Sequence, residues 1–114
     1  MRATFIELPP FARCRADYLD DEAYRNLQNA LMRHPDAGDV IPGAGGLRKL
    51  RYSDRIRGKG KRGGLRVIYY WRVSVDQFWM FTLYDKDEAS DLSMDQRKAL
   101  AAMLRRELQA RSTK

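Results

Sequence analysis

The chain has very little of the chemistry on which most enzyme sites depend. It carries a single cysteine, Cys14, and a single histidine, His34, in 114 residues. One cysteine excludes an internal disulfide and offers no metal-ligand spacing. His34 precedes Pro35 at a predicted helix end, where a histidine suits the role of a C-terminal cation better than that of a catalytic base. The sequence therefore gives no support to Ser/His/Asp or Cys/His nucleophile sites.

Long apolar runs are missing as well. No stretch approaches the roughly 20 apolar residues of a membrane span. The first eight residues contain Glu7 and lead into Pro9-Pro10, so they do not resemble a signal peptide. We therefore expect a cytoplasmic protein with no membrane partner. A hydrophobic fraction of 44% is ordinary for a globular chain, and the length suits one domain over residues 1–114.

Acidic residues are nearly absent from one segment, residues 48–66. This segment holds nine of the 22 lysines and arginines against one acid, a net charge of +8, whereas the whole chain carries +7. The basicity is therefore local, which favours a polyanion-binding site. Within it, glycines that allow close backbone approach alternate with cations that can donate to phosphate: Gly58, Lys59, Gly60, Lys61, Arg62, Gly63, Gly64 and Arg66. A solvated basic loop without a ligand is the simpler alternative.

Periodicity and turn signals predict the order β-α-α-β-β-β-α. The expected ranges are strand 4–8, helix 11–18, a helix between N-cap Asp20 and Pro35, strands 47–52, 65–73 and 78–84, and a helix from 93 to about 110. Ser93 and Gln96 form a capping box for that last helix. Residues 36–46 are expected to form a loop with Val40 and Ile41 turned inward. Strands gathered after helices predict an α+β fold with a central antiparallel sheet, two N-terminal helices and a C-terminal helix.

Four acids near the last strand, Asp85, Asp87, Glu88 and Asp91, superficially resemble a metal cluster. They lack fixed ligand spacing and precede a helix N-terminus, so we interpret them as solvated charges that complement the helix dipole. No metal or other cofactor is expected. The strand positions of Trp71 and Trp79 indicate core residues.

RNA can be cleaved without a metal when its 2′-hydroxyl attacks the adjacent phosphate. The step needs charge stabilisation on the phosphorane oxygens, a base and an acid. Arginine suits the phosphate because its planar fork bonds two oxygens and keeps its charge, and neighbouring cations favour the neutral form of a lysine, which can act as a base. These residues are compatible with plain nucleic-acid binding or with an inefficient nuclease whose substrate is positioned by something else.

The stretch GKGKRGGLRVIYY, Gly58 to Tyr70, resembles the catalytic hairpin of the RelE/HigB toxins of bacterial type II toxin–antitoxin modules. Three further segments resemble the HigB-like branch: Gly38 to Ile41, Gly45 to Lys49 and Tyr84 to Leu92. The resemblance spans essentially the whole chain. It implies a RelE-like fold and a ribosome-dependent endoribonuclease that cuts mRNA in the ribosomal A site.

On matching positions the resemblance assigns catalysis to Lys59, Lys61, Arg62, Arg66 and Lys86. We expect RNA binding by neighbouring cations and two tyrosines, namely Arg48, Lys49, Arg51, Arg55, Arg57, Tyr70 and Tyr84. Asp87 replaces an arginine of many relatives and Ser93 replaces a tyrosine of some, so the acid and base roles stay open between Lys86 and Tyr84. Truncation of Arg66 to alanine is expected to abolish activity with little loss of stability.

The implied partners are the 70S ribosome, mRNA and a cognate antitoxin, a small helix-turn-helix protein. The antitoxin either lays acidic residues over Arg55 to Arg66 or blocks ribosome entry by bulk, with contacts on the helices around Tyr24 and Leu27. The alternative function is a RelE/ParE-fold toxin or nucleic-acid-binding protein without nuclease activity, for example a gyrase inhibitor. ParE-type relatives usually lack so dense a basic hairpin, so the cationic segment favours RNA.

Overall fold

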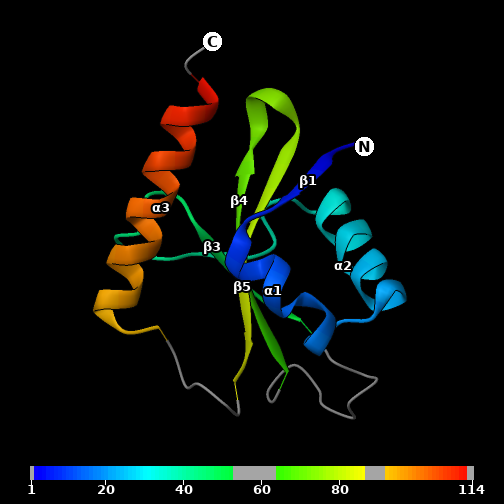
Figure 1. Ribbon diagram of the computed structural model, residues 1–114. Coiled ribbons are helices and arrows are strands. Elements are labelled where there is room, and N and C mark those ends of the chain that lie inside the picture. The colour runs from blue at the N-terminus through cyan, green and yellow to red at the C-terminus, as the bar shows by residue number, and fades with distance from the viewer. Residues whose placement is uncertain (1, 53–63, 87–91, 113–114) are drawn as a thin grey trace.

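The computed structural model describes residues 2–52, 64–86 and 92–112, which fold around one five-stranded sheet. In chain order the elements are β1 (Thr4–Glu7), α1 (Pro9–Tyr18), α2 (Asp21–Arg33), β2 (Asp39–Val40), β3 (Arg48–Tyr52), β4 (Leu65–Arg72), the 3-10 turn η2 (Val73–Val75), β5 (Gln77–Asp85) and α3 (Met94–Ser112). The strand order across the sheet is β1-β5-β4-β3-β2. Figure 1 shows α2 and α3 on opposite sides of the sheet, with α1 crossing near β5.

The α+β class is confirmed, and the sheet is mixed, so the expected central antiparallel sheet holds for β2 to β5 but not for the edge strand β1. Strands β2 to β5 are antiparallel to their neighbours, but β1 joins the edge parallel to β5, with Phe5 opposite Phe78. Parallel neighbours need a long crossover between them. Here the connection from β1 to β5 includes the two N-terminal helices and three strands. Local sequence patterns do not show that two strands so far apart in the chain are neighbours in the sheet.

The helix starts follow the local chemistry of their first residues. Asp20 caps α2, its Oδ1 accepting a hydrogen bond of 2.8 Å from the backbone N–H of Ala23. At α3 the Ser93 Oγ accepts from the backbone N–H of Gln96 at 3.1 Å, and the Gln96 Oε1 accepts from that of Ser93 at 2.8 Å. Both caps were predicted, and each satisfies donors that the helix cannot pair by itself.

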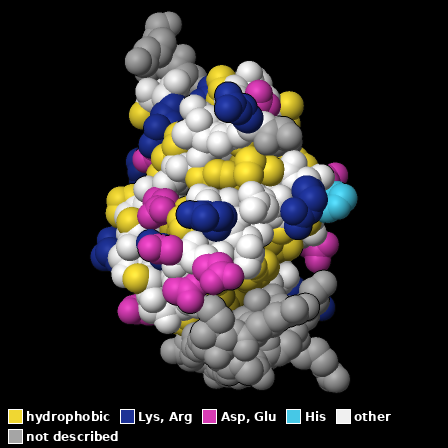
Figure 2. Space-filling view, turned by 90° about the vertical axis from the view of Figure 1, so that its right-hand side faces the viewer, with side chains coloured by type: hydrophobic (Ala, Val, Ile, Leu, Met, Phe, Trp, Pro, Cys, Tyr) yellow, Lys and Arg dark blue, Asp and Glu magenta, His cyan; other side chains and the backbone are white. Residues whose placement is uncertain are grey.

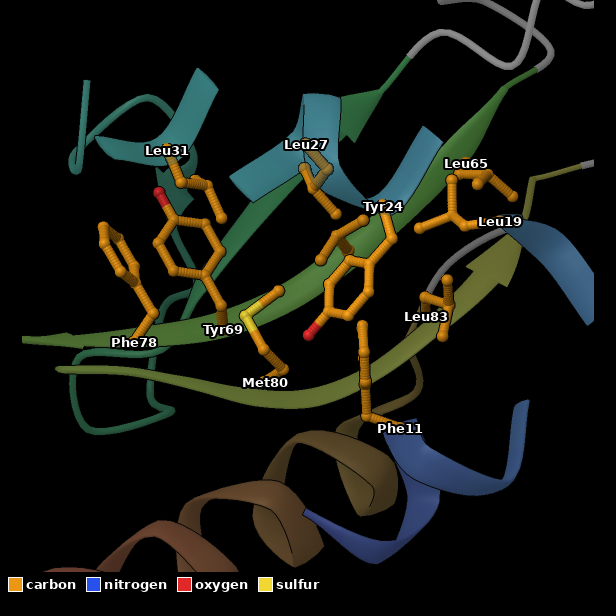
Figure 3. Close-up of a cluster of buried hydrophobic side chains, with 11 residues drawn as sticks. Phe11, Leu19, Tyr24, Leu27, Leu31, Leu65, Tyr69, Phe78, Met80 and Leu83 are labelled. Atoms are coloured by element: carbon orange, nitrogen blue, oxygen red, sulfur yellow. The ribbon is translucent and has the colours of Figure 1, made fainter. Parts of the chain in front are cut away.

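Two apolar clusters fill the two faces of the sheet. On the α2 side, Leu27 and Leu31 point toward the strands and meet Tyr69 and Met80 (Figure 3). On the other side, Leu100 and Leu104 of α3 pack with Trp79, Phe81 and Ile68. Burying each large side chain contributes about 1.5–3 kcal/mol, so these clusters hold both layers on the sheet.

Two α2 residues named for the expected antitoxin contacts belong to the core. Tyr24 is 8% exposed and Leu27 is fully buried. Arg25 and Asn26 beside them on α2 are exposed, and the expectation of antitoxin contacts around this helix stays a prediction. The expected core role of the tryptophans is confirmed for Trp79, which is fully buried, whereas Trp71 is half-buried over Phe78.

The segment predicted as a loop contains the short edge strand β2. Asp39 lies opposite Lys49 and Val40 opposite Arg48. Ile41 turns inward as expected, with 6% exposure, but Val40 is 54% exposed because β2 is the last strand of the sheet. The expectation that Val40 is buried is therefore wrong.

A β-bulge in β5 changes which side chains share a face. Thr82 lies opposite Ile68 and Met80 opposite Tyr69, so Phe81 has no opposite residue on β4. Trp79 and Phe81 belong to the α3-side cluster, and regular alternation from them would turn Tyr84 toward α2. The extra residue reverses the alternation, and Tyr84 lies on the α3 side instead.

Candidate nucleic-acid interface

The basic residues of β3 divide between the two faces of the sheet, as the alternation of a strand requires. Arg48 faces α2: its Nη1 donates to the carbonyl of Gly38 at 2.7 Å and to that of Asp36 at 3.3 Å. The guanidinium is therefore already used to hold the chain that leads into β2. Lys49 and Arg51 face α3, so the three residues expected to contact RNA from β3 do not lie on one face of the sheet.

Tyr69 also holds the segment that joins α2 to β2. Its Oη accepts from the backbone N–H of Gly38 at 3.0 Å and donates to the carbonyl of Pro35 at 2.8 Å. A Cβ on Gly38 would lie 2.9 Å from Tyr69 Cε1 and 3.1 Å from the Lys49 carbonyl. Burial raises the pKa of the Tyr69 phenol, an effect that the Gly38 hydrogen bond and Arg48 partly offset. The contacts set the position of β2.

Two cations and a tyrosine form a row across three strands. Arg51 on β3 lies directly opposite Arg66 on β4, and Arg66 lies opposite Tyr84 on β5. Opposite residues of antiparallel strands project to the same face, with Cβ atoms about 4.5–5.5 Å apart. Like charges in this arrangement repel, so an anion seated between the arginines would relieve the repulsion. We call Arg51, Arg66 and Tyr84 the cationic row.

The members of the row differ in exposure. Arg51 is exposed, whereas Arg66 is only 5% exposed and the Tyr84 hydroxyl oxygen is buried. The Nη1 of Arg66 reaches back to the carbonyls of Gly64 and Leu65 at 3.4 and 3.3 Å. Removing so buried a side chain leaves a cavity. The expectation that truncating Arg66 would cost little stability is therefore not supported.

Lys86 lies directly beyond β5, two residues after Tyr84 and on the exposed surface. Its backbone N–H donates to the carbonyl of Gly64 at 3.2 Å, which joins the end of β5 to the start of β4. Tyr70 shares the α3-side face with Arg66 but lies four residues further along β4, about 13 Å at strand spacing. There it packs against Trp79, with ring centroids 5.5 Å apart, so the structure places it in the core cluster rather than beside the row.

An open groove adjoins the row. It has a volume of about 160 Å³ and is lined by Asp39, Val40, Ile41, Pro42, Lys49, Arg51, Leu92 and Arg97. Arg97 was missed by the sequence interpretation, because α3 carries several arginines and nothing local distinguishes this one. Arg97 lies in the first turn after the capping box at Ser93 and Gln96. This position is the sequence signal that could have identified it, because the start of a helix often lies near the ends of neighbouring strands.

The remaining predicted site residues, Arg55, Arg57, Lys59, Lys61 and Arg62, lie outside the described residues, as do Asp87, Glu88 and Asp91. Asp85 is buried in β5. Among residues 2–52, 64–86 and 92–112, no three His, Cys, Asp or Glu side chains gather as a metal would require. Over the same residues no helix has the length and apolar character to cross a bilayer.

On the α2 side, the described residues carry charges of both signs. Figure 2 shows that face with acidic and basic side chains interspersed and with apolar patches between them. The sequence of α2 accounts for this balance, since Asp21 and Glu22 are matched by Arg25 and Arg33. The row and the groove lie on the opposite, α3-side face. No known protein-family model matches the chain.

Proposed function

We propose that this chain is the toxin of a toxin–antitoxin module, a ribosome-dependent endoribonuclease that cuts mRNA in the A site and so inhibits translation. The observation that carries the proposal is the cationic row, Arg51 opposite Arg66 opposite Tyr84. It lies at the sheet end to which residues 53–63 connect in the sequence, and those residues contain five more cations. The resemblance of Gly58 to Tyr70 to the RelE/HigB hairpin supports the same function.

The row suits transesterification of RNA. The 2′-oxygen attacks the adjacent phosphorus, its bond to phosphorus forms as the bond to the 5′-oxygen breaks, and the products are a 2′,3′-cyclic phosphate and a free 5′-hydroxyl. Arginines stabilise the negative charge that develops on the phosphorane oxygens. One proton leaves the 2′-hydroxyl and one reaches the 5′-oxygen. Tyr84 within the row and Lys86 beyond it are described groups that can carry a proton, and Lys59 and Lys61 are further candidates from the resemblance.

The exposure of the row is consistent with dependence on the ribosome. Free RNA meets the exposed Arg51 and Lys86, while Arg66 and the Tyr84 hydroxyl are buried behind them. A phosphate reaches Arg66 only when its side chain leaves the carbonyls of Gly64 and Leu65, and a substrate held in place would offset the free energy of that change. Rigid presentation of mRNA by the ribosome would supply this positioning.

The test is a brief induction of the chain in bacteria, followed by primer extension on cellular mRNA. We expect growth arrest and discrete new 5′ ends at codon boundaries. Arg51→Ala removes a phosphate donor and Lys86→Ala removes a candidate proton carrier, so each should slow cutting on purified ribosome complexes by about 10²–10³-fold. Arg105→Ala removes an exposed cation of α3 outside the row and should cut like the parent.

Two other outcomes would contradict the proposal in different ways. Growth arrest with intact transcripts would favour a toxin-fold protein without nuclease activity, for example a gyrase inhibitor. Normal growth with soluble, folded protein present would remove the toxin assignment altogether. Within the proposal, a small helix-turn-helix antitoxin keeps the chain inactive in the cytoplasm. If it covers the basic segment with acidic residues, its affinity should fall steeply as salt rises.

A further inference from the structure

We infer that the groove between β2, β3 and the start of α3 binds the nucleotide next to the cleaved phosphate, with Arg51 and Arg97 on its backbone phosphate and the apolar wall of Val40, Pro42 and Leu92 against its base. This inference rests on the proposed function, since it extends the RNA path beyond the cationic row. It adds Arg97 and the apolar wall to the surface that contacts RNA.

The charge of the groove favours an anionic ligand. Lys49, Arg51 and Arg97 line it against one carboxylate, Asp39. The cations come from two elements, a strand and a helix, that meet only in the folded chain. Cations that converge on one hollow from separate elements suit a phosphate, because each can donate to a different oxygen.

The size of the groove indicates part of a longer ligand. Sites for free cofactors and drug-sized ligands usually measure about 300–1,000 Å³, whereas this groove measures about 160 Å³ and is open. An open hollow of that size holds part of a longer ligand rather than a whole independent one. Arg51 lines the groove and also begins the cationic row, and the neighbouring strand that carries Arg66 is about 4.8 Å away. An RNA strand that contacts the row therefore continues into the groove.

The apolar part of the lining suits a base more than a second phosphate. Among the lining residues, Val40 is 54% exposed, Pro42 is exposed, Leu92 is half-buried and Ile41 is buried. Proteins that bind single-stranded nucleic acid without sequence preference combine a basic groove with surfaces against which bases rest. An acidic protein segment would use the cations but would gain little from this wall.

The experiment measures binding by the free full-length chain, so that it does not depend on catalysis. The probe is a fluorescent single-stranded RNA hexamer with 2′-O-methyl groups, which cannot be cleaved, and anisotropy is recorded over a salt series. We expect Arg97→Gln to weaken binding several-fold and to reduce the salt slope by about 0.7–1, the value for one phosphate contact. Asp39→Asn should tighten binding, Arg97→Lys should restore most of it, and Arg105→Gln should match the parent.

The outcomes separate this inference from the proposed function. The inference about the groove is overturned if Arg97→Gln binds the hexamer as tightly as the parent, or if Arg105→Gln loses as much affinity as Arg97→Gln. Neither result affects the proposed cutting of mRNA on the ribosome by the parent. Arg97-dependent binding by a chain that cuts no mRNA supports the groove and removes the nuclease. Tighter binding of poly-glutamate than of the hexamer, with the same dependence on Arg97, overturns the inference in favour of an acidic protein partner. A thermal melt of each variant confirms folding.

Discussion

Replacing Tyr69 by phenylalanine removes one oxygen atom from the core and should detach one wall of the groove. In the native chain that oxygen accepts from Gly38 N–H at 3.0 Å and donates to the Pro35 carbonyl at 2.8 Å. Both bonds hold the connection between α2 and β2. Phenylalanine fills nearly the same volume, so the change isolates the hydrogen bonds from the packing of the ring.

The size of the expected loss in stability follows from the burial of Tyr69 and Gly38. Tyr69 is fully buried and Gly38 is buried, so the variant leaves a backbone N–H without a partner and without water. An unsatisfied buried donor costs about 1–3 kcal/mol. At about 4 °C per kcal/mol for a domain of roughly this size, we expect the melting temperature to fall by about 4–12 °C.

Tyr24→Phe is the matched control, because it deletes the same atom from the same cluster (Figure 3). The Tyr24 hydroxyl oxygen is buried near Glu7 and Gln28, but it makes no hydrogen bond of regular geometry among the described residues. Its removal should therefore cost less than removal of the Tyr69 hydroxyl, which makes two such bonds. Urea denaturation of the three proteins measures the difference. A Tyr69→Phe loss below about 0.5 kcal/mol, the low end for one net hydrogen bond, or an equal loss in both variants, would refute this account of the Gly38 anchor.

Three further predictions follow from local geometry. Gly38→Ala should destabilise the fold by about 1–3 kcal/mol, since its Cβ would lie 2.9 Å from Tyr69 Cε1; an unchanged urea midpoint would contradict this. Ser93→Ala should cost about 1 kcal/mol because it breaks the cap with Gln96, and the loss of helix signal on heating should begin earlier than in the parent. Burial raises the pKa of Tyr24 and of Tyr69 above the usual 10.0, so the folded chain keeps protons that the unfolded chain releases. The free energy of unfolding should therefore be unaffected by these groups below about pH 10 and fall above it, which denaturation at about pH 9 and about pH 11 would reveal.

Local signals in the sequence were enough for most of the secondary structure. Asp20 and the Ser93–Gln96 box each act within one turn of a helix, so their effect is encoded by residues three apart. A strand over residues 47–52 puts Arg48 and Arg51 on opposite faces, because a strand turns successive side chains to opposite faces. Charge concentration needs no structure either, since net charge is a count over the chain.

The sequence could not reveal which strands are neighbours. Residues 4–7 pair in parallel with residues 77–80. Residues 39–40 form an edge strand that their composition does not predict. Both pairings depend on contacts between distant parts of the chain. A strand propensity describes a single segment. Which strands pair depends on which strand edges the rest of the chain leaves available for hydrogen bonding.

The composition of the candidate site was decided by tertiary structure. The bulge at Phe81 reverses the alternation of β5 and turns Tyr84 to the same face as Arg66; one residue fewer would have buried it under α2. Arg48 is basic like its neighbours, but Gly38 and Asp36 occupy its guanidinium, while Arg97 reaches the groove only because α3 begins beside β3. A sequence records which side chains carry charge. Their distance from one another depends on strand register and helix placement, which the packing of the whole chain determines.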